Sequence, residues 1–223
     1  MRTTAFALLV FLAGAAPALA QKPRSAQPAP AVAAQAPQAP AATPAERVGG
    51  ENARVVIEEY ADFECPYCGL HEVQYGDSVL AWVRAQQGAV RFDFYDVALR
   101  YHAAAAPAAH AARCAGEQQQ YHAAKHAIFA AQKEWAETWD AVQRVTAIAR
   151  ATVADGAAFD RCMTADASAL YGILGANLER GRALGIPGTP TFVIRVGERQ
   201  AQIVDPASPD SIAKVVRSLE PPR

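Results

Sequence analysis

The stretch ADFECPYCGLHEV, from Ala61 to Val73, places Cys65 and Cys68 with two residues between them at the end of an apolar segment. That segment, RVVIEEYADF, has the β-branched and aromatic content of a strand. Pro66 suits the first turn of a helix, where its missing N–H costs nothing. The stretch therefore predicts a cysteine pair at a strand-to-helix junction. Such a pair serves as a redox centre, as half of a metal site, or as a structural disulfide.

The expected position of Cys65 at a helix start favours its thiolate, which is the reactive form. A free thiol has a pKa of about 8.5, but unpaired backbone N–H groups and the positive end of the helix dipole stabilise an anion there. Cys68 follows one helical turn later and should lie deeper. We therefore expect Cys65 to attack and Cys68 to resolve the mixed disulfide. A stabilised thiolate favours the reduced form, so the disulfide would be a strong oxidant.

A zinc site at the pair is disfavoured, because zinc sites need two C-x-x-C pairs or a Cys/His set at short spacing. The remaining cysteines, Cys114 and Cys162, are isolated on separate segments. His122 and His126 are four residues apart, but no acidic or cysteine ligand stands near them at helical spacing, so we expect an exposed helix face. His71 is expected to be solvated. No metal site is predicted.

The rest of the chain divides into elements of recognisable pattern. The helix after Cys65 is expected to run to Gly88, and AVRFDFYDVAL then forms a second strand. Residues 102–184 are Ala-rich and contain no strand candidate, so we expect several helices there. TFVIRV and RQAQIV form a hairpin around Gly197-Glu198, and SPDSIAKVVRSL forms a closing helix.

The first twenty residues have the features of a cleaved signal peptide, with Arg2 ahead of a short apolar stretch and small residues at its end. A permanent membrane anchor is the alternative. The apolar stretch is shorter than the ~20 residues that cross a bilayer, so we expect no stable membrane insertion after cleavage. Residues 21–46 are mostly Ala, Pro and Gln and predict a disordered tether. The folded part should begin near Arg47 and lie in the periplasm, an oxidising compartment.

The composition fits one globular domain plus additional chain, with 223 residues of which 52% are hydrophobic. A domain of this size can build its core without disulfide support. The formal net charge of −1 gives no general attraction to phosphate backbones. Nucleic acid is therefore not an expected partner.

Two motifs together resemble the DsbA-like branch of the thioredoxin superfamily, the exported thiol:disulfide oxidoreductases. They are DFECPYC after an apolar strand and GIPGTPTFVI near the C-terminal end. The resemblance covers nearly the whole chain from Arg47 onward. It implies an α/β thioredoxin-like fold over residues 47–223 with an inserted helical subdomain at about 102–184. It also implies a structural disulfide between Cys114 and Cys162, with separate buried thiols as the alternative.

The resemblance further implies roles for residues around the cysteine pair. Pro190 matches the cis-proline that packs against the active-site disulfide, and Thr189 would pair with the substrate chain; a trans proline on an edge strand is the alternative. Tyr67 would line the substrate groove. Glu59 resembles the buried acid beneath the disulfide, where burial would raise its pKa and let it relay the proton of the resolving cysteine. Pleating places Glu58 on the opposite face, so one of the two acids could be solvated instead.

These features predict an exported thiol:disulfide oxidoreductase that exchanges a Cys65–Cys68 disulfide with cysteines of substrate proteins, with oxidation as the favoured direction. It needs no cofactor beyond the cysteine pair, and a membrane redox partner is expected. The alternatives are an isomerase or reductase kept reduced by a membrane partner, and a chaperone or metal carrier that uses the thiols without turnover. Isomerase-like relatives usually carry an N-terminal dimerisation domain, where this chain has the Ala/Pro-rich tether.

Overall fold

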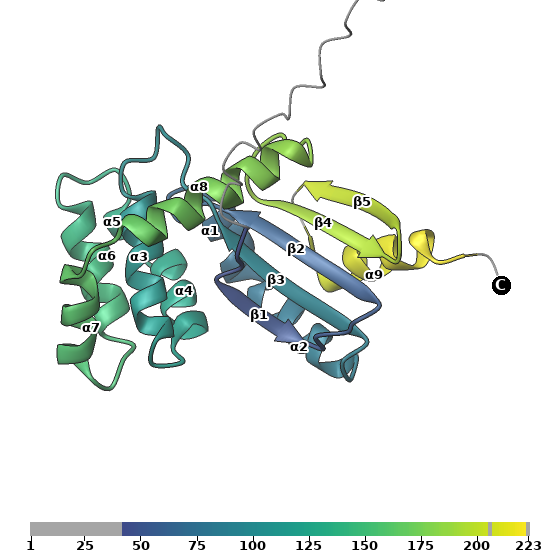
Figure 1. The fold of residues 1–223 in the computed structure, drawn as a ribbon, viewed down its shortest axis with the longest axis horizontal. Helices are drawn as coiled ribbons and strands as arrows, with labels where there is room; N and C mark the ends of the chain where they lie inside the picture. Colours follow the sequence, from purple (N-terminus) through teal and green to yellow (C-terminus); the bar gives the residue numbers. More distant parts are fainter. Residues whose placement is uncertain (1–41, 205–206, 222–223) are drawn as a thin grey trace, which may run out of the picture. The chain divides into compact units, whose positions relative to one another are not determined.

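The chain folds around a mixed five-stranded sheet in the computed structural model, which describes residues 42–204 and 207–221. Two parallel strands form its centre, and a helical connection returns the chain between them. An antiparallel hairpin extends one side, and a short antiparallel strand closes the other (Figure 1). In sheet order the strands are β1 (Glu46–Gly49), β3 (Val90–Asp96), β2 (Val55–Ala61), β4 (Thr191–Val196) and β5 (Arg199–Val204).

The segment that joins β2 to β3 is a helical run with a local widening. It contains α1 (Pro66–His71), the π-helical η1 (Glu72–Gly76) and α2 (Asp77–Ala85). A Cβ on Gly76 would lie 2.6 Å from the carboxyl group of Glu72, so the glycine leaves room for that side chain. The apolar spacing predicted a helix here but did not reveal the π-helical turn.

Helices fill the interval between β3 and β4, which confirms the predicted helical block. The Ala-rich α3 is buried along most of its length, because small side chains allow close packing against α4 and α6. In Figure 1, α3 to α7 form a group beside the sheet, and α8 leads from this group back toward β4. The helices are α3 (Ala105–Gly116), α4 (Tyr121–Ala130), α5 (Gln132–Trp135), α6 (Ala141–Arg150), α7 (Gly156–Thr164) and α8 (Ser168–Ala183).

Side-chain alternation along β2 divides the interior into two apolar clusters, one on each face of the sheet. Val55 and Ile57 belong to the larger cluster, which also contains residues of α1, α2 and the closing helix α9 (Pro209–Leu219). Tyr60 belongs to a smaller cluster against α8, with its ring stacked on that of Tyr95 at a centroid distance of 4.9 Å. The cysteine pair lies in the larger cluster, where β2 ends and α1 begins.

The C-terminal elements form where their local signals predict them. Gly197 has a φ of +60°, which favours glycine in the turn between β4 and β5. Ser208 caps α9, because its Oγ accepts a hydrogen bond from the backbone N–H of Ser211 at 3.2 Å. The predicted hairpin and closing helix are therefore confirmed.

The described chain makes sheet contacts earlier than Arg47, where folding was expected to begin. The backbone N–H of Ala45 donates to the carbonyl of Phe94 at 2.7 Å, and β1 continues this pairing along β3. Arg47 itself pairs with the buried Asp93 at 2.6 Å. A strand of four residues carries little pattern of its own, so the sequence did not predict β1. The predicted signal peptide and most of the predicted tether, residues 1–41, lie outside the described residues.

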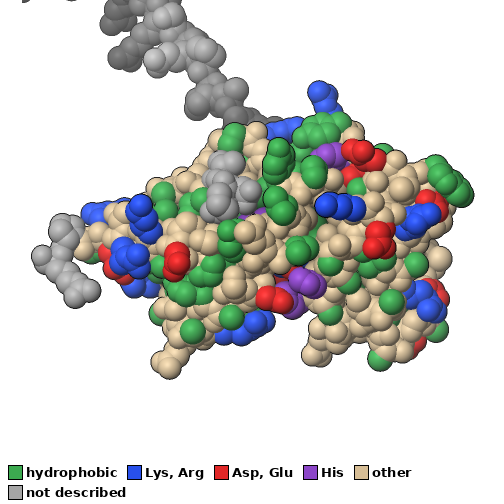
Figure 2. Space-filling model, turned by 180° about the vertical axis from the view of Figure 1, so that it is seen from behind, with side chains coloured by type: hydrophobic (Ala, Val, Ile, Leu, Met, Phe, Trp, Pro, Cys, Tyr) green, Lys and Arg blue, Asp and Glu red, His purple; other side chains and the backbone are tan. Residues whose placement is uncertain are grey.

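The surface mixes charged and apolar side chains. On the face shown in Figure 2, basic and acidic side chains lie among one another and among apolar ones. Near the cysteine pair, α1 and η1 expose Tyr67, Leu70 and Val73. Within residues 42–204 and 207–221, no helix combines the length and the apolar character that crossing a bilayer requires.

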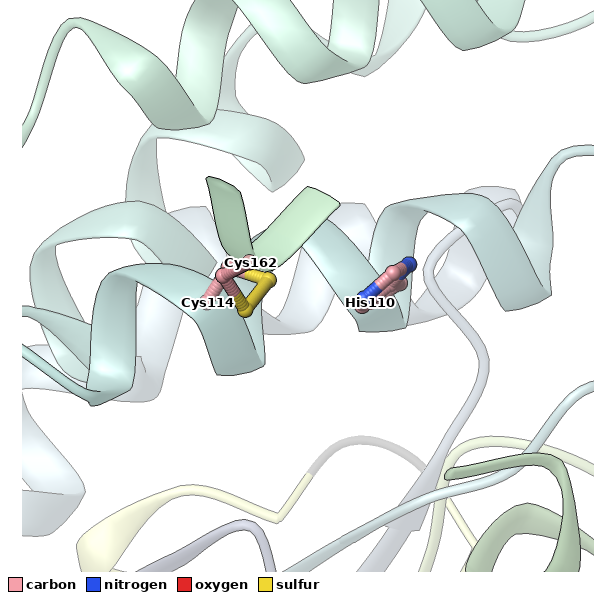
Figure 3. Close-up of side chains that lie close together, drawn as sticks. All are labelled: His110, Cys114 and Cys162. Atoms are coloured by element: carbon pink, nitrogen blue, oxygen red, sulfur yellow. A yellow bond between two sulfur atoms is a disulfide. The ribbon is translucent and has the colours of Figure 1, made fainter. Parts of the chain in front are cut away.

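A disulfide links the inserted helices to one another. Cys114 in α3 and Cys162 in α7 are bonded, with Cα atoms 5.7 Å apart, which is the pair that the resemblance implied (Figure 3). His110 lies one turn before Cys114 on α3, with its side chain in the same region (Figure 3). Because the two sulfurs are bonded to each other, they are not available to this histidine as thiolate ligands for a shared metal.

Removing this disulfide should destabilise the domain. The two cysteines are 48 residues apart, and closing a loop of that length contributes about 4 kcal/mol to the free energy of unfolding on the chain-entropy model. We expect Cys114→Ser/Cys162→Ser to lose about 3–4 kcal/mol in urea unfolding followed by circular dichroism. The control is Cys65→Ser/Cys68→Ser, which opens no long loop. A loss below about 1 kcal/mol would contradict the structural role.

Candidate active site

The cysteine pair lies at a strand-to-helix junction, as predicted. Cys65 is the N-cap residue of α1, Pro66 is the first helical residue, and both cysteines are free thiols in this structure. The relative exposure of Cys65 is 7%, whereas that of Cys68 is 1%. A group that approaches from solvent therefore meets Cys65 first.

The two thiols are pushed toward opposite protonation states. A hydrogen bond from the Cys68 side chain lowers the pKa of Cys65 most strongly, and burial opposes it. Smaller contributions come from Thr189 and from the backbone N–H groups of Cys68 and Tyr67, and together they bring the pKa of Cys65 to about 6. Burial, together with the same cysteine–cysteine hydrogen bond, raises the pKa of Cys68 well above its usual value.

These causes include the one expected from the sequence and add another. The helix start was expected to hold the thiolate mainly through its backbone N–H groups. These groups do lower the pKa of Cys65, but the neighbouring thiol contributes more than either of them does singly. The buried Cys68 stays protonated and is therefore available as a donor.

A cis-proline loop packs against the reactive sulfur. The Thr189–Pro190 peptide bond is cis, and Cys65 Sγ lies 3.2 Å from the Thr189 carbonyl, to which the thiol donates a hydrogen bond when it is protonated. Pro190 is buried, whereas Tyr67, between the two cysteines in sequence, is 64% exposed. The structure thus brings together Cys65, Thr189 and Pro190, with Tyr67 at the surface beside them. Their roles in substrate binding remain predictions.

Glu59 is buried on the face of the sheet that α1 covers, with 2% exposure. Its carboxylate lies 3.7 Å from Nδ1 of His71. The expectation that His71 is solvated was wrong, because this side chain is 1% exposed and its ring packs on that of Phe192 at 4.7 Å. His71 follows Cys68 by three residues, so both lie on the buried side of the helix. The proton-relay role of Glu59 remains a prediction.

Glu58 is also buried, so the expectation that one of the two acids could be solvated is not met. It lies on the opposite face of the sheet, where the Tyr60 hydroxyl donates to it at 3.0 Å. Arg180 of α8 pairs with the same carboxylate at 2.7 Å, and Arg195 of β4 also pairs with it. These two arginines compensate a charge that the strand alone would leave unpaired.

Asp62, which contacts Cys68, and its partner His102 were not singled out from the sequence. The buried Asp62 carboxylate accepts hydrogen bonds from the backbone N–H groups of Glu64 (2.8 Å) and Leu99 (2.7 Å), and it lies 3.0 Å from Nδ1 of His102. The backbone N–H of Asp62 donates to Cys68 Sγ at 3.5 Å. Burial raises the pKa of the Asp62 carboxyl. This residue therefore ties the turn before α1 to the segment after β3.

Gln132 of the inserted helices holds the same turn from the other side. Its buried side-chain amide donates to the carbonyls of Phe63 (2.8 Å) and Cys65 (2.9 Å). A Cβ on Gly69 would lie 2.4 Å from its Oε1, so glycine is needed for this approach. Nothing in the sequence links Gln132 to the cysteines, because the contact depends on how the inserted helices pack.

His122 and His126 lie at the edge of a buried ionic cluster, which corrects the expected exposed helix face. Lys125 between them is fully buried and pairs with Glu46 (3.0 Å) and Glu72 (3.2 Å). His122 lies 3.3 Å from Glu46, and His126 lies 3.5 Å from Glu72. The acids come from β1 and η1, so inspection of the helix sequence alone could not find them.

Comparison with known proteins assigns the chain to a family. A sequence profile of the family described as Thioredoxin matches residues 42–217. The chain belongs to the thioredoxin family. Membership of this family implies thiol:disulfide oxidoreductase activity at the level of the family, and the chain carries a C-x-x-C pair at Cys65 and Cys68. No curated protein matches the chain.

Several solved structures share the thioredoxin-like fold with this chain. A thioredoxin-like oxidoreductase from Silicibacter pomeroyi DSS-3 has 23% identity and a TM-score of 0.60, over 78% of this chain and 90% of that one. Wolbachia pipientis alpha-DsbA1 has 20% identity and a TM-score of 0.64, over 78% and 89%. Pseudomonas aeruginosa DsbA2 has 24% identity and a TM-score of 0.59, over 80% and 95%. These similarities confirm the thioredoxin-like fold with a helical insertion.

The pKa of Cys65 should be measurable from the pH dependence of its alkylation. Only the thiolate reacts with iodoacetamide, so the rate should rise with a midpoint near pH 6, the pKa to which Cys65 is lowered. Mass spectrometry of the reduced protein from pH 4 to 9 measures this rate. Cys68→Ala should move the midpoint upward because it removes the strongest donor, whereas Cys68→Ser keeps a hydroxyl donor and should move it less. Equal midpoints in both variants would exclude the Cys68 hydrogen bond as the main cause.

Proposed function

We propose that this protein is an exported thiol:disulfide oxidoreductase that donates the Cys65–Cys68 disulfide to cysteines of substrate proteins. The observation that carries the proposal is the separation of the two pKa values, with Cys65 lowered to about 6 and Cys68 raised. An ionised Cys65 stabilises the reduced pair at neutral pH. The oxidised pair is then the higher-energy state and transfers its disulfide readily.

The transfer proceeds in two steps. A substrate thiolate attacks Cys65 Sγ, because this sulfur is the more exposed of the two; the bond between the cysteines breaks and Cys68 leaves and takes up a proton. A second substrate thiolate then attacks the substrate sulfur of the mixed disulfide and releases Cys65 as a thiolate. The substrate loses two electrons and the cysteine pair gains them.

The groups around the sulfur support this sequence of events. The backbone of the cis-proline loop lies next to the Cys65 sulfur, which contacts the Thr189 carbonyl. An extended substrate segment bonded to Cys65 would therefore pair with the backbone of this loop. Tyr67 is exposed at the same site and would contact the segment. The buried Glu59 would relay the proton of Cys68.

The effect of pH follows from the lowered pKa of Cys65. The ionised thiol stabilises the reduced folded protein most fully above its usual pKa of 9.0, and this contribution is lost as the pH falls through about 6. The driving force for oxidising substrates therefore weakens in acid. A periplasmic location, with a membrane redox partner that restores the disulfide, would fit this role.

A reductase or isomerase kept reduced by a membrane partner is the second candidate. Such an enzyme also needs a nucleophilic Cys65, so the lowered pKa of Cys65 supports this candidate as well. A thiol-based chaperone or metal carrier is the candidate outside the enzymes. It predicts a stoichiometric complex without turnover.

Oxidation of a reduced two-cysteine peptide tests the proposal. The oxidised protein, with glutathione disulfide as the terminal oxidant, should oxidise many equivalents of the peptide, which mass spectrometry follows. Cys65→Ser should return the rate to that of glutathione disulfide alone, because it removes the attacked sulfur. Unchanged turnover in this variant would remove the assignment, and a tight complex without turnover would favour the binding protein.

A further inference from the structure

A pocket of about 190 Å³ opens beside the cis-proline loop, on the sheet face that α8 covers. Its walls come from four parts of the chain: the end of β2, the segment that follows β3, the last turns of α8, and the loop before β4. None of its lining residues belongs to α1 or α9. The residues that line the pocket include Tyr60, Leu99, Tyr101, Leu178, Ile186 and Thr189.

The pocket and the reactive sulfur share one neighbouring residue, Thr189. Thr189 lines the pocket, and its carbonyl accepts the hydrogen bond of the Cys65 thiol at 3.2 Å. A polypeptide bonded to Cys65 that pairs with the backbone of this loop would therefore pass the mouth of the pocket. Consecutive residues of an extended chain point to opposite sides, so one residue near the bonded cysteine would face it.

The walls of the pocket are suited to an apolar group. The Tyr60 hydroxyl is engaged with Glu58 (3.0 Å) and Arg180 (2.7 Å), so the tyrosine offers its ring and not its hydroxyl. Arg182 at the rim is paired with Glu179 on its own helix, so its charge is compensated. A binding site of this kind prefers a side chain that needs no hydrogen bond.

Gly181 of α8 keeps the pocket open. A Cβ at this position would meet the side chains of Ile186 and Tyr60 at 3.6 Å, which is ordinary contact distance, so a longer side chain would extend into the space between them. The volume exceeds the roughly 150 Å³ of an apolar protein cavity that accommodates benzene. It is therefore large enough for one aromatic or branched aliphatic side chain.

We propose that this pocket is a specificity subsite that takes one large apolar side chain of the substrate polypeptide, close to the cysteine that reacts with Cys65. The inference rests on the proposed thiol:disulfide exchange function and adds a preference among substrates. It differs from the exposed apolar residues Tyr67, Leu70 and Val73, which lie on α1 and η1 and do not line the pocket. Transfer of such a side chain from water should raise kcat/KM by roughly 10- to 100-fold over a small polar one.

A peptide series tests the subsite. Each reduced two-cysteine peptide carries Phe or Ser at one position, placed in turn at the three positions on either side of the first cysteine. The oxidised full-length protein should oxidise the Phe peptide at least about 10-fold better than the Ser peptide at one or two positions. Phe no better than Ser at every position would overturn the proposal.

Two variants connect this preference to the pocket. Gly181→Leu should fill the space and reduce the Phe/Ser ratio toward one. Tyr101→Ala removes an exposed part of the wall (72% exposed) and should lower the same ratio even where Gly181→Leu does not fold. The matched control is Tyr171→Ala, which removes an exposed tyrosine of α8 that does not line the pocket, and it should keep the wild-type ratio. Retention of the wild-type ratio in Tyr101→Ala would overturn the proposal.

Oxidation of dithiothreitol by the wild-type protein distinguishes failure of the proposed function from failure of the proposed subsite. This small dithiol has no side chain that could enter the pocket, so its oxidation reports the chemistry of the cysteine pair alone. If dithiothreitol and the peptides are all left unoxidised, the proposed function fails. If both kinds of thiol are oxidised without a Phe preference, only the subsite fails.

Discussion

The hydrogen bond between the Cys68 thiol and the Cys65 sulfur is the interaction on which the chemistry of this protein depends. It acts in opposite directions on its two members, since it stabilises Cys65 as a thiolate and keeps Cys68 protonated. For Cys68 burial is the larger cause of the raised pKa, because this thiol has almost no contact with water in which to ionise. The Cys65 sulfur is therefore the one that exchanges with substrate, and the Cys68 thiol donates a hydrogen bond to it.

Segments far apart in sequence hold this geometry in place. Asp62 fixes the turn before α1 and donates its backbone N–H to Cys68. Gln132 reaches the same turn from the inserted helices through the carbonyls of Phe63 and Cys65. The cis-proline loop supplies the Thr189 carbonyl on the third side. The helical insertion is therefore a structural part of the redox site as well as an addition to the fold.

The sequence predicted the features whose causes are local. Pro66 at a helix start and the Gly197 turn each depend on a few neighbouring residues, and the resemblance supplied the cis bond at Pro190. The alternation along β2 likewise placed Glu58 and Glu59 on opposite faces. These local signals, together with the family resemblance, were sufficient for the fold and for the position of the cysteine pair.

The features that the sequence did not reveal depend on contacts over long distances in the chain. Lys125 becomes a buried cation because β1 and η1 bring Glu46 and Glu72 to it. His102 reaches Asp62 from the segment after β3. His71 is buried because Phe192 of β4 packs against its ring. In each case the partner, and not the residue type, determines the environment.

The reduction potential of the Cys65–Cys68 couple as a function of pH tests the central claim most directly. The account predicts a potential above roughly −200 mV at pH 7. The potential should fall by about 59 mV per pH unit in acid and by about 30 mV per unit once Cys65 is ionised, since one fewer proton then accompanies the two electrons. The change of slope should occur near pH 6, the pKa to which Cys65 is lowered. A potential near about −270 mV with no change of slope below pH 8 would contradict the account.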